Sequence, residues 1–104
     1  MFFKDGVKVN GVKPEIALAL IACNDVFNYY GKQMVVTSVA DGKHSLTSLH
    51  YVGFAFDLRG SIAWGFTESE LNSIKKDLIE ALTDEFDVIL EKDHYHIEFQ
   101  VKRS

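Results

Sequence analysis

The segment "SLHYVGFAFDLR" (residues 48–59) ends in six residues in which every second side chain is large and apolar. Successive side chains of a β-strand point to opposite faces. Phe54, Phe56 and Leu58 would therefore share one face, with Asp57 on the other. An acid after a Phe-Ala-Phe run is unusual for a buried strand. We therefore ask whether Asp57 works together with His50, seven residues earlier.

A second segment, "HYHIEFQV" (residues 94–101), has the same two-faced pattern. Its apolar face carries Tyr95, Ile97 and Phe99. Its polar face carries two histidines and a glutamate, and these are His94, His96 and Glu98. If the polar faces of the two strands meet, we expect His50, Asp57 and one or both late histidines to converge.

The rest of the chain predicts two helices and further short strands. Residues 11–31 have helical spacing, with Pro14 in the first turn and Gly31 at the end. Residues 67–86 open with a capping box formed by Thr67 and Glu70. Because strands and helices do not alternate regularly, we predict an α+β fold with a small, mostly antiparallel sheet flanked by two main helices. Phe2 and Phe3 are expected to pack under the first helix. The side chains expected in the helix cores are Ile16, Leu20, Cys23, Phe27, Tyr30, Leu71, Ile74, Leu78 and Leu82.

Composition narrows the classes of function. The chain has 104 residues, 47% of them hydrophobic and 25% charged, as expected for one globular domain spanning residues 1–104. Its net charge of −4 argues against a nucleic-acid partner. The apolar run at residues 16–23 is too short to span a bilayer, and no export signal precedes it, so we expect a cytoplasmic protein without a membrane partner. The single Cys23 excludes an internal disulfide and is expected to be a packed core residue.

Two imidazoles and a carboxylate form a donor set suited to catalytic zinc. Zinc accepts neutral histidine nitrogen and carboxylate oxygen, and a fourth open position holds water. The ion lowers the pKa of that water to about 7, so that hydroxide forms at neutral pH. A nearby acid or histidine then takes the proton and later passes it to a leaving amine.

The segment "SLHYVGFAFDLR" resembles the Ser-x-His-x-x-Gly-x-Ala-x-Asp motif of the zinc D-alanyl-D-alanine carboxypeptidase family. The wider group includes lysostaphin-type enzymes, VanX-type dipeptidases and the Sonic hedgehog signalling domain. "EKDHYHIEF" (residues 91–99) is similar to the second motif of the same group, and "VVTS" followed by "DGKHS" is similar to the strand and loop before the first motif in short phage members. The resemblance covers residues 12–102 and implies a hedgehog/DD-peptidase-like fold and a peptidoglycan-cleaving activity.

Carried over by motif position, the resemblance implies a ligand set for one zinc ion per chain, with Ser48 close by. The three ligands would be His50, Asp57 and His96. Several cell-wall members carry an acid three residues before the last ligand, which here is Asp93, whereas others use the histidine two residues before it, here His94. We favour Asp93 as general base, with His94 steadying the oxyanion or sharing the proton. We expect Glu91, which matches neither spacing, to be a solvated turn residue.

One departure concerns substrate binding. Many members have an arginine after the Thr-Ser strand, where this chain has "TSVADGKHS" (residues 37–45), so Lys43 or His44 is expected to substitute. Lysine supplies the charge but lacks the bidentate geometry of arginine. Arg59 is expected to hold a loop. Trp64 is expected to anchor a strand to a helix, with the floor of a substrate groove as the alternative.

Two hypotheses from different classes follow. In the first, the protein is a zinc metallopeptidase that hydrolyses peptidoglycan stem peptides, as a monomeric lysis enzyme of a bacteriophage or prophage. It would be made in the host cytoplasm and act at the cell wall after release, or travel in the virion. In the second, the zinc is structural and the chain is a non-catalytic binding or virion-assembly module of the same fold. The presence of both Asp93 and His94 favours catalysis, because a structural site needs no base.

Overall fold

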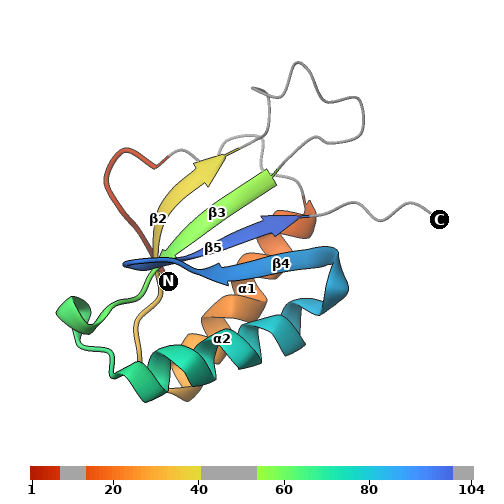
Figure 1. Ribbon diagram of the computed structural model, residues 1–104. Coiled ribbons are helices and arrows are strands. Elements are labelled where there is room, and N and C mark those ends of the chain that lie inside the picture. Colours follow the sequence, from red (N-terminus) through yellow and green to blue (C-terminus); the bar gives the residue numbers. More distant parts are fainter. Residues whose placement is uncertain (8–13, 41–53, 100–104) are drawn as a thin grey trace.

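The structure is a computed structural model that describes residues 1–7, 14–40 and 54–99. Two helices pack on one side of a five-stranded sheet whose strand order is β1-β2-β3-β5-β4 (Figure 1). β1 runs parallel to β2, and the other neighbouring strands are antiparallel, which confirms the predicted α+β fold. The elements are β1 (Phe2–Phe3), α1 (Pro14–Tyr29), β2 (Val35–Ala40), β3 (Phe54–Arg59), α2 (Glu68–Leu82), β4 (Phe86–Leu90) and β5 (His94–Phe99).

Local signals in the sequence account for both helices. α1 begins at Pro14, as predicted, and the chain leaves it through Gly31, whose φ of 67° suits glycine. α2 begins after Thr67, which forms the predicted capping box with Glu70. The predicted core positions of α2 are all buried. Tyr30, a predicted core residue that follows the end of α1, is only partly buried. Within the described residues, no helix is long and apolar enough to cross a membrane.

Cys23 is a packing residue, as predicted. It lies on the buried side of α1 and has no exposed surface. Burial raises the pKa of its thiol to about 12, because a thiolate would lose its hydration there. The side chain therefore stays protonated and unreactive at neutral pH.

The two faces of the sheet differ in the way that the alternation of β3 and β5 predicts. Phe56 and Leu58 of β3 are buried against the helices, as are Tyr95 and Ile97 of β5. Residues between them in sequence point to the opposite face, which in Figure 1 no helix covers. We call this second face the open face of the sheet; its residues in β3 and β5 include Asp57, Arg59, His94, His96 and Glu98.

The first strand corrects one expectation. Phe2 and Phe3 were expected to pack under the first helix, and this is wrong. They form β1, which pairs with Val35 and Val36 of β2, and they are 58% and 39% exposed. The pairing fixes where the chain leaves the sheet, because the backbone N–H of Lys4 donates to the carbonyl of Val36.

A bulge in β2 changes which of its side chains reach the open face. Val36 pairs with Leu58, but the next pair joins Ser38 to Asp57, so that Thr37 is an extra residue. A bulge of this kind re-aims the side chains that follow it. Paired residues of neighbouring strands share a face, so Ser38 lies on the open face with Asp57.

Candidate functional site

Strand pairing brings together polar residues from the two motifs. In the antiparallel pair β3–β5, Asp57 lies directly opposite His96, and Arg59 lies directly opposite His94. Opposite residues have Cβ atoms about 4.5 to 5.5 Å apart, close enough for their side chains to meet. Residues separated by 39 positions in sequence therefore form one cluster on the open face.

Asp57 is the centre of this cluster. Its Oδ1 atom lies 2.9 Å from Nδ1 of His96, and its Oδ2 atom lies 3.7 Å from Nε2 of His94. The three side chains are 23%, 29% and 27% exposed for Asp57, His96 and His94 respectively. They are thus partly shielded from water but open to a ligand. This arrangement agrees with the expected convergence of Asp57 with the late histidines.

His96 is held from both sides. Its Nε2 atom lies 3.2 Å from Oε1 of Glu98, two residues along the same strand, while its Nδ1 atom faces Asp57. Burial acts to lower the pKa of His96, but the hydrogen bonds to the two carboxylates outweigh it and leave the pKa raised. A carboxylate behind a histidine is the usual partner of a metal-ligating imidazole, because it fixes the orientation of the ring.

His94 is held by the residues of the turn before it. The tight connection between β4 and β5, residues 91–93, is closed by a hydrogen bond from the backbone N–H of Glu91 to the carbonyl of His94. Oδ1 of Asp93 lies 2.7 Å from Nδ1 of His94, and Oε1 of Glu91 lies 2.9 Å from its Nε2. The hydrogen bond to Asp93 raises the pKa of His94, and the same bond lowers the pKa of the Asp93 carboxyl.

The turn residues meet expectation only in part. The side chain of Asp93 contacts Nδ1 of His94, and its role as general base stays a prediction. Glu91 was expected to be a solvated turn residue. Its side chain is half exposed but also contacts His94, so it belongs to the cluster.

The donor set of Asp57 and His96 fits zinc chemically. Two ligands of a tetrahedral zinc ion, with bonds of about 2.0 Å, lie about 3.3 Å apart. Nδ1 of His96 lies 2.9 Å from Oδ1 of Asp57, which is a hydrogen-bonding distance and a few tenths of an ångström shorter than that separation. Within the described residues, no group of three or more His, Cys, Asp or Glu side chains is arranged to hold a metal ion.

The remaining site residues of the sequence analysis cannot be placed in this cluster. His50, the expected first ligand, lies outside the described residues, as do Ser48, Lys43 and His44. Asp57 and His96 are therefore two of the three expected ligands brought together. The third stays a prediction from the motif.

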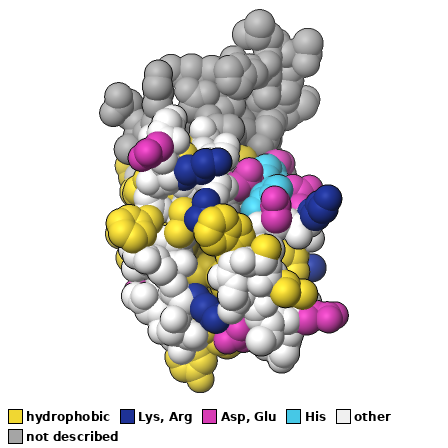
Figure 2. Space-filling view, turned by 90° about the vertical axis from the view of Figure 1, so that its left-hand side faces the viewer, with side chains coloured by type: hydrophobic (Ala, Val, Ile, Leu, Met, Phe, Trp, Pro, Cys, Tyr) yellow, Lys and Arg dark blue, Asp and Glu magenta, His cyan; other side chains and the backbone are white. Residues whose placement is uncertain are grey.

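Beside the cluster, the structure contains a polar pocket of about 430 Å³ that the sequence analysis did not anticipate. Figure 2 shows histidine, acidic and basic side chains gathered on this side of the molecule, next to exposed hydrophobic ones. The pocket is lined by Lys4, Thr37, Ser38, Asp57, Arg59, Trp64, Asp93 and His94. The alternation of β3 placed Arg59 beside Asp57, but no local signal marked Lys4, which reaches the pocket only through the pairing of β1.

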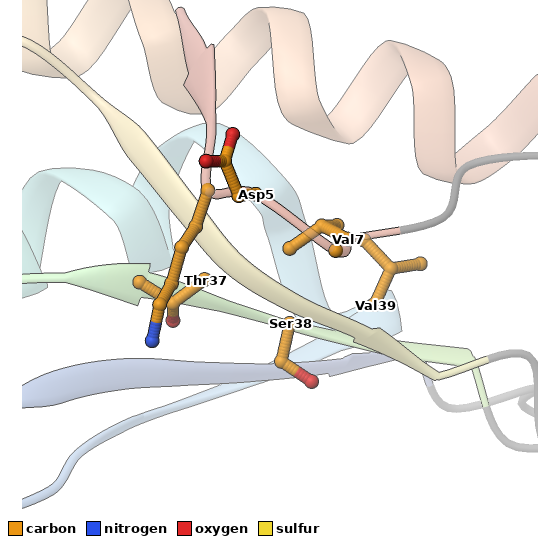
Figure 3. A pocket seen from close by; sticks show the side chains of 7 residues that line it. Asp5, Val7, Thr37, Ser38 and Val39 are labelled. Atoms are coloured by element: carbon orange, nitrogen blue, oxygen red, sulfur yellow. The ribbon is translucent and has the colours of Figure 1, made fainter.

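A second pocket of about 380 Å³ adjoins the first and shares Lys4, Thr37 and Ser38 with it. It lies between β2 and the segment that follows β1 (Figure 3). In this view Val39 lies beside Val7, whereas Ser38 points away from both. This agrees with the bulge, which turns Ser38 to the open face and Val39 to the other. The bulge thus supplies a hydroxyl group to the edge of the candidate site.

No family model, curated protein sequence or solved structure matches this chain, so the functional argument depends on its own residues and their geometry.

Proposed function

We propose that this protein is a zinc-dependent peptidase that hydrolyses stem peptides of peptidoglycan. The observation that carries the proposal is the contact of 2.9 Å between Asp57 and His96. It joins the last residue of the first motif to the last histidine of the second, across paired strands. The two motifs resemble those of the zinc D-alanyl-D-alanine carboxypeptidase family in the same order.

The proposed roles follow from the contacts. Asp57 and His96 would hold zinc, with His50 as the third ligand that the motif implies, and Glu98 would orient the His96 ring from behind. Bound zinc supplies a water of lowered pKa and a positive charge for the developing oxyanion. The chain must then provide a proton acceptor beside the ligands.

Asp93 and His94 provide that acceptor as one unit. Their side chains lie 2.7 Å apart, within the range of a charge-assisted hydrogen bond. His94 reaches towards Asp57 on its other side, and Asp93 remains largely exposed. The pair can therefore take a proton at the site and return it to the leaving amine, a contribution worth about a hundredfold or more in rate.

The test combines metal analysis with substrate analysis. Elemental analysis of metal-replete protein should give about one zinc per chain. Chelation should lower the melting temperature by on the order of 10 °C, because a ligand at a hundredfold excess over its dissociation constant stabilises the folded state by about 2.7 kcal/mol. Purified peptidoglycan should release peptides that mass spectrometry identifies.

The outcomes separate the hypotheses. Zinc without released peptides would favour the binding or assembly module of the same fold. If the protein binds no zinc and its melting is unaffected by chelator, the cluster is a histidine–carboxylate network without metal, and the proposal fails.

A further inference from the structure

We propose that the surface between α1 and α2 binds an amphipathic helix of another protein, with basic side chains at both ends of its apolar face. Both helices pack on one side of the sheet, whereas Asp57 and His96 lie on the open face (Figure 1). The inference therefore goes beyond the proposed function, and neither depends on the other.

The surface is hollowed by two adjoining cavities of about 330 and 410 Å³. Ala22 of α1 and Ala81 of α2 line both cavities, so the hollow is continuous along the two helices. We call it the helix groove. Because alanine side chains are short, they leave space between the helices that the side chains of a ligand can fill.

One face of α1 forms a wall of the helix groove. Its residues recur every three or four positions, which places them on the same side of the helix, and they include Glu15, Leu18, Ala22, Asp25 and Tyr29. Leu18 is 67% exposed and Tyr29 is 82% exposed, although both are large and hydrophobic. Exposed apolar side chains that line one continuous hollow are typical of an interaction surface.

The exposed tryptophan differs from these residues because it has a partner within the chain. Trp64 lies in the 3-10 turn Ile62–Trp64 that follows β3 and is 59% exposed, so it is not the buried anchor that the sequence suggested. The guanidinium carbon of Arg59 lies 3.8 Å from the centroid of its ring, the geometry of a cation–π contact. The helix groove, by contrast, is lined by no lysine or arginine among the described residues.

Contacts between the helices hold the helix groove in shape. The hydroxyl of Tyr30 donates to Oδ2 of Asp77 over 2.5 Å, which ties the end of α1 to α2. This hydrogen bond raises the pKa of Tyr30 to about 12, so the hydroxyl remains a donor at neutral pH. The ring of Tyr29 packs edge-on against that of Tyr30, with centroids 5.2 Å apart. A preformed groove needs little reorganisation when a ligand binds.

The charges of the helix groove indicate which ligand fits. Glu15 and Glu85 line the cavity at one end, and Asp25 and Asp77 line the cavity at the other. Along α1, Glu15 and Asp25 are separated by about 15 Å, or roughly three helical turns. A complementary helix therefore carries cations about three turns apart, with apolar side chains between them that face Ala22 and its neighbours.

The same charges argue against other occupants. In a symmetric dimer the same surface of both copies would meet. The charged residues of α1 are Glu15 and Asp25, so a second copy would place acids against acids, which weakens association. An anionic lipid surface or a nucleic acid would be repelled in the same way. A basic amphipathic helix both fills the groove and compensates its charge.

NMR titration of the full-length protein with three synthetic peptides of about 16 residues tests the proposal. The first peptide has leucines along one helical face and lysines at both ends. The second has glutamates in place of the lysines, and the third has the composition of the first with its leucines spread around the helix.

Two variants alter the helix groove, and each has a matched control. Asp25→Lys reverses a charge at one end, and Ala81→Gln fills the space between the helices. Asp87→Lys in β4 and Ala17→Gln in α1 make the same changes at exposed positions that do not line the groove. Both altered groove positions are exposed as well, so all four variants should melt close to the parent protein.

We expect the first peptide to bind with a Kd on the order of 10 μM and to shift backbone resonances of α1 and α2. The other two peptides should bind about tenfold more weakly or less. Asp25→Lys should weaken binding of the first peptide about 3- to 10-fold, the scale of an exposed ion pair replaced by repulsion. Ala81→Gln should weaken it about tenfold, because its side chain occupies space that the ligand needs. Asp87→Lys and Ala17→Gln should match the parent protein.

Several results would overturn the inference. These are equal or absent binding of the three peptides, binding unaltered in Asp25→Lys and Ala81→Gln, and resonance shifts confined to the open face. Self-association in sedimentation equilibrium that Ala81→Gln abolishes would assign the groove to a second copy and also overturn it. Selective binding of the first peptide that chelator leaves unchanged, by a protein that releases no peptides from peptidoglycan, would support the groove and count against the peptidase alone.

Discussion

Tyr95→Phe is expected to destabilise the protein without changing its affinity for zinc. Tyr95 lies between His94 and His96 in sequence but points to the buried face of β5, where it has no exposed surface. Its hydroxyl donates to the backbone carbonyl of Leu71 in the first turns of α2. This hydrogen bond ties the strand that carries both histidines to the helix layer beneath it.

The magnitude follows from what the substitution leaves behind. Leu71 lies inside α2, where its carbonyl can still accept a helical N–H bond. Phenylalanine brings no polar atom, so neither partner becomes an unsatisfied buried group. The loss is then the net value of one hydrogen bond, about 1 kcal/mol. In a domain of this size that lowers the melting temperature by about 4 to 8 °C.

Urea unfolding followed by circular dichroism measures the change, and an unchanged m-value would show that the unfolded state is not altered. Tyr29→Phe is the matched control, because Tyr29 is 82% exposed and its substitution should stay within about 0.5 kcal/mol of the parent protein. Zinc affinity should be unchanged, since pairing with β3 and β4 still fixes the register of β5. A Tyr95→Phe protein as stable as the parent, or one that loses zinc, would refute the reasoning.

Four further substitutions test the site and its support. His96→Ala should lose both metal and activity, whereas His94→Ala should keep most of its zinc and turn over slowly or not at all. Elemental analysis and peptide release measure the two properties. The reverse pattern would mean that the second motif has been aligned two residues out of register. Asp93→Asn keeps the shape of the side chain but removes its basicity, so it should retain zinc and lose about a hundredfold or more in rate. Near-normal turnover of Asp93→Asn, together with a His94→Ala protein that binds zinc but is inactive, would assign the base to His94 alone. Gly60→Ala should destabilise by about 1 to 3 kcal/mol in urea unfolding, because its Cβ would lie 2.7 Å from the buried ring of Tyr95; unchanged stability would mean that the ring shifts freely.

Local pattern was sufficient for both helices and for the faces of β3 and β5. The alternation around Asp57 predicted which side chains of β3 and β5 would be buried, and the capping box at Thr67 predicted where α2 begins. These features depend on residues within about four positions of one another, because helix and strand periods and caps are short-range. The convergence of Asp57 with the late histidines could be expected from the same alternation.

Only the tertiary structure decided the features that depend on pairing between distant segments. The register that sets Asp57 opposite His96 and the bulge at Thr37 each arise from hydrogen bonds between strands, which no local pattern specifies. The parallel pairing of β1 brings Lys4 to the pocket. The same pairing holds Phe2 and Phe3 in the sheet, so the prediction that they pack under α1 was wrong. Side-chain alternation assigned each residue to a face, but the relative positions of residues on that face depended on how the strands align in the folded sheet.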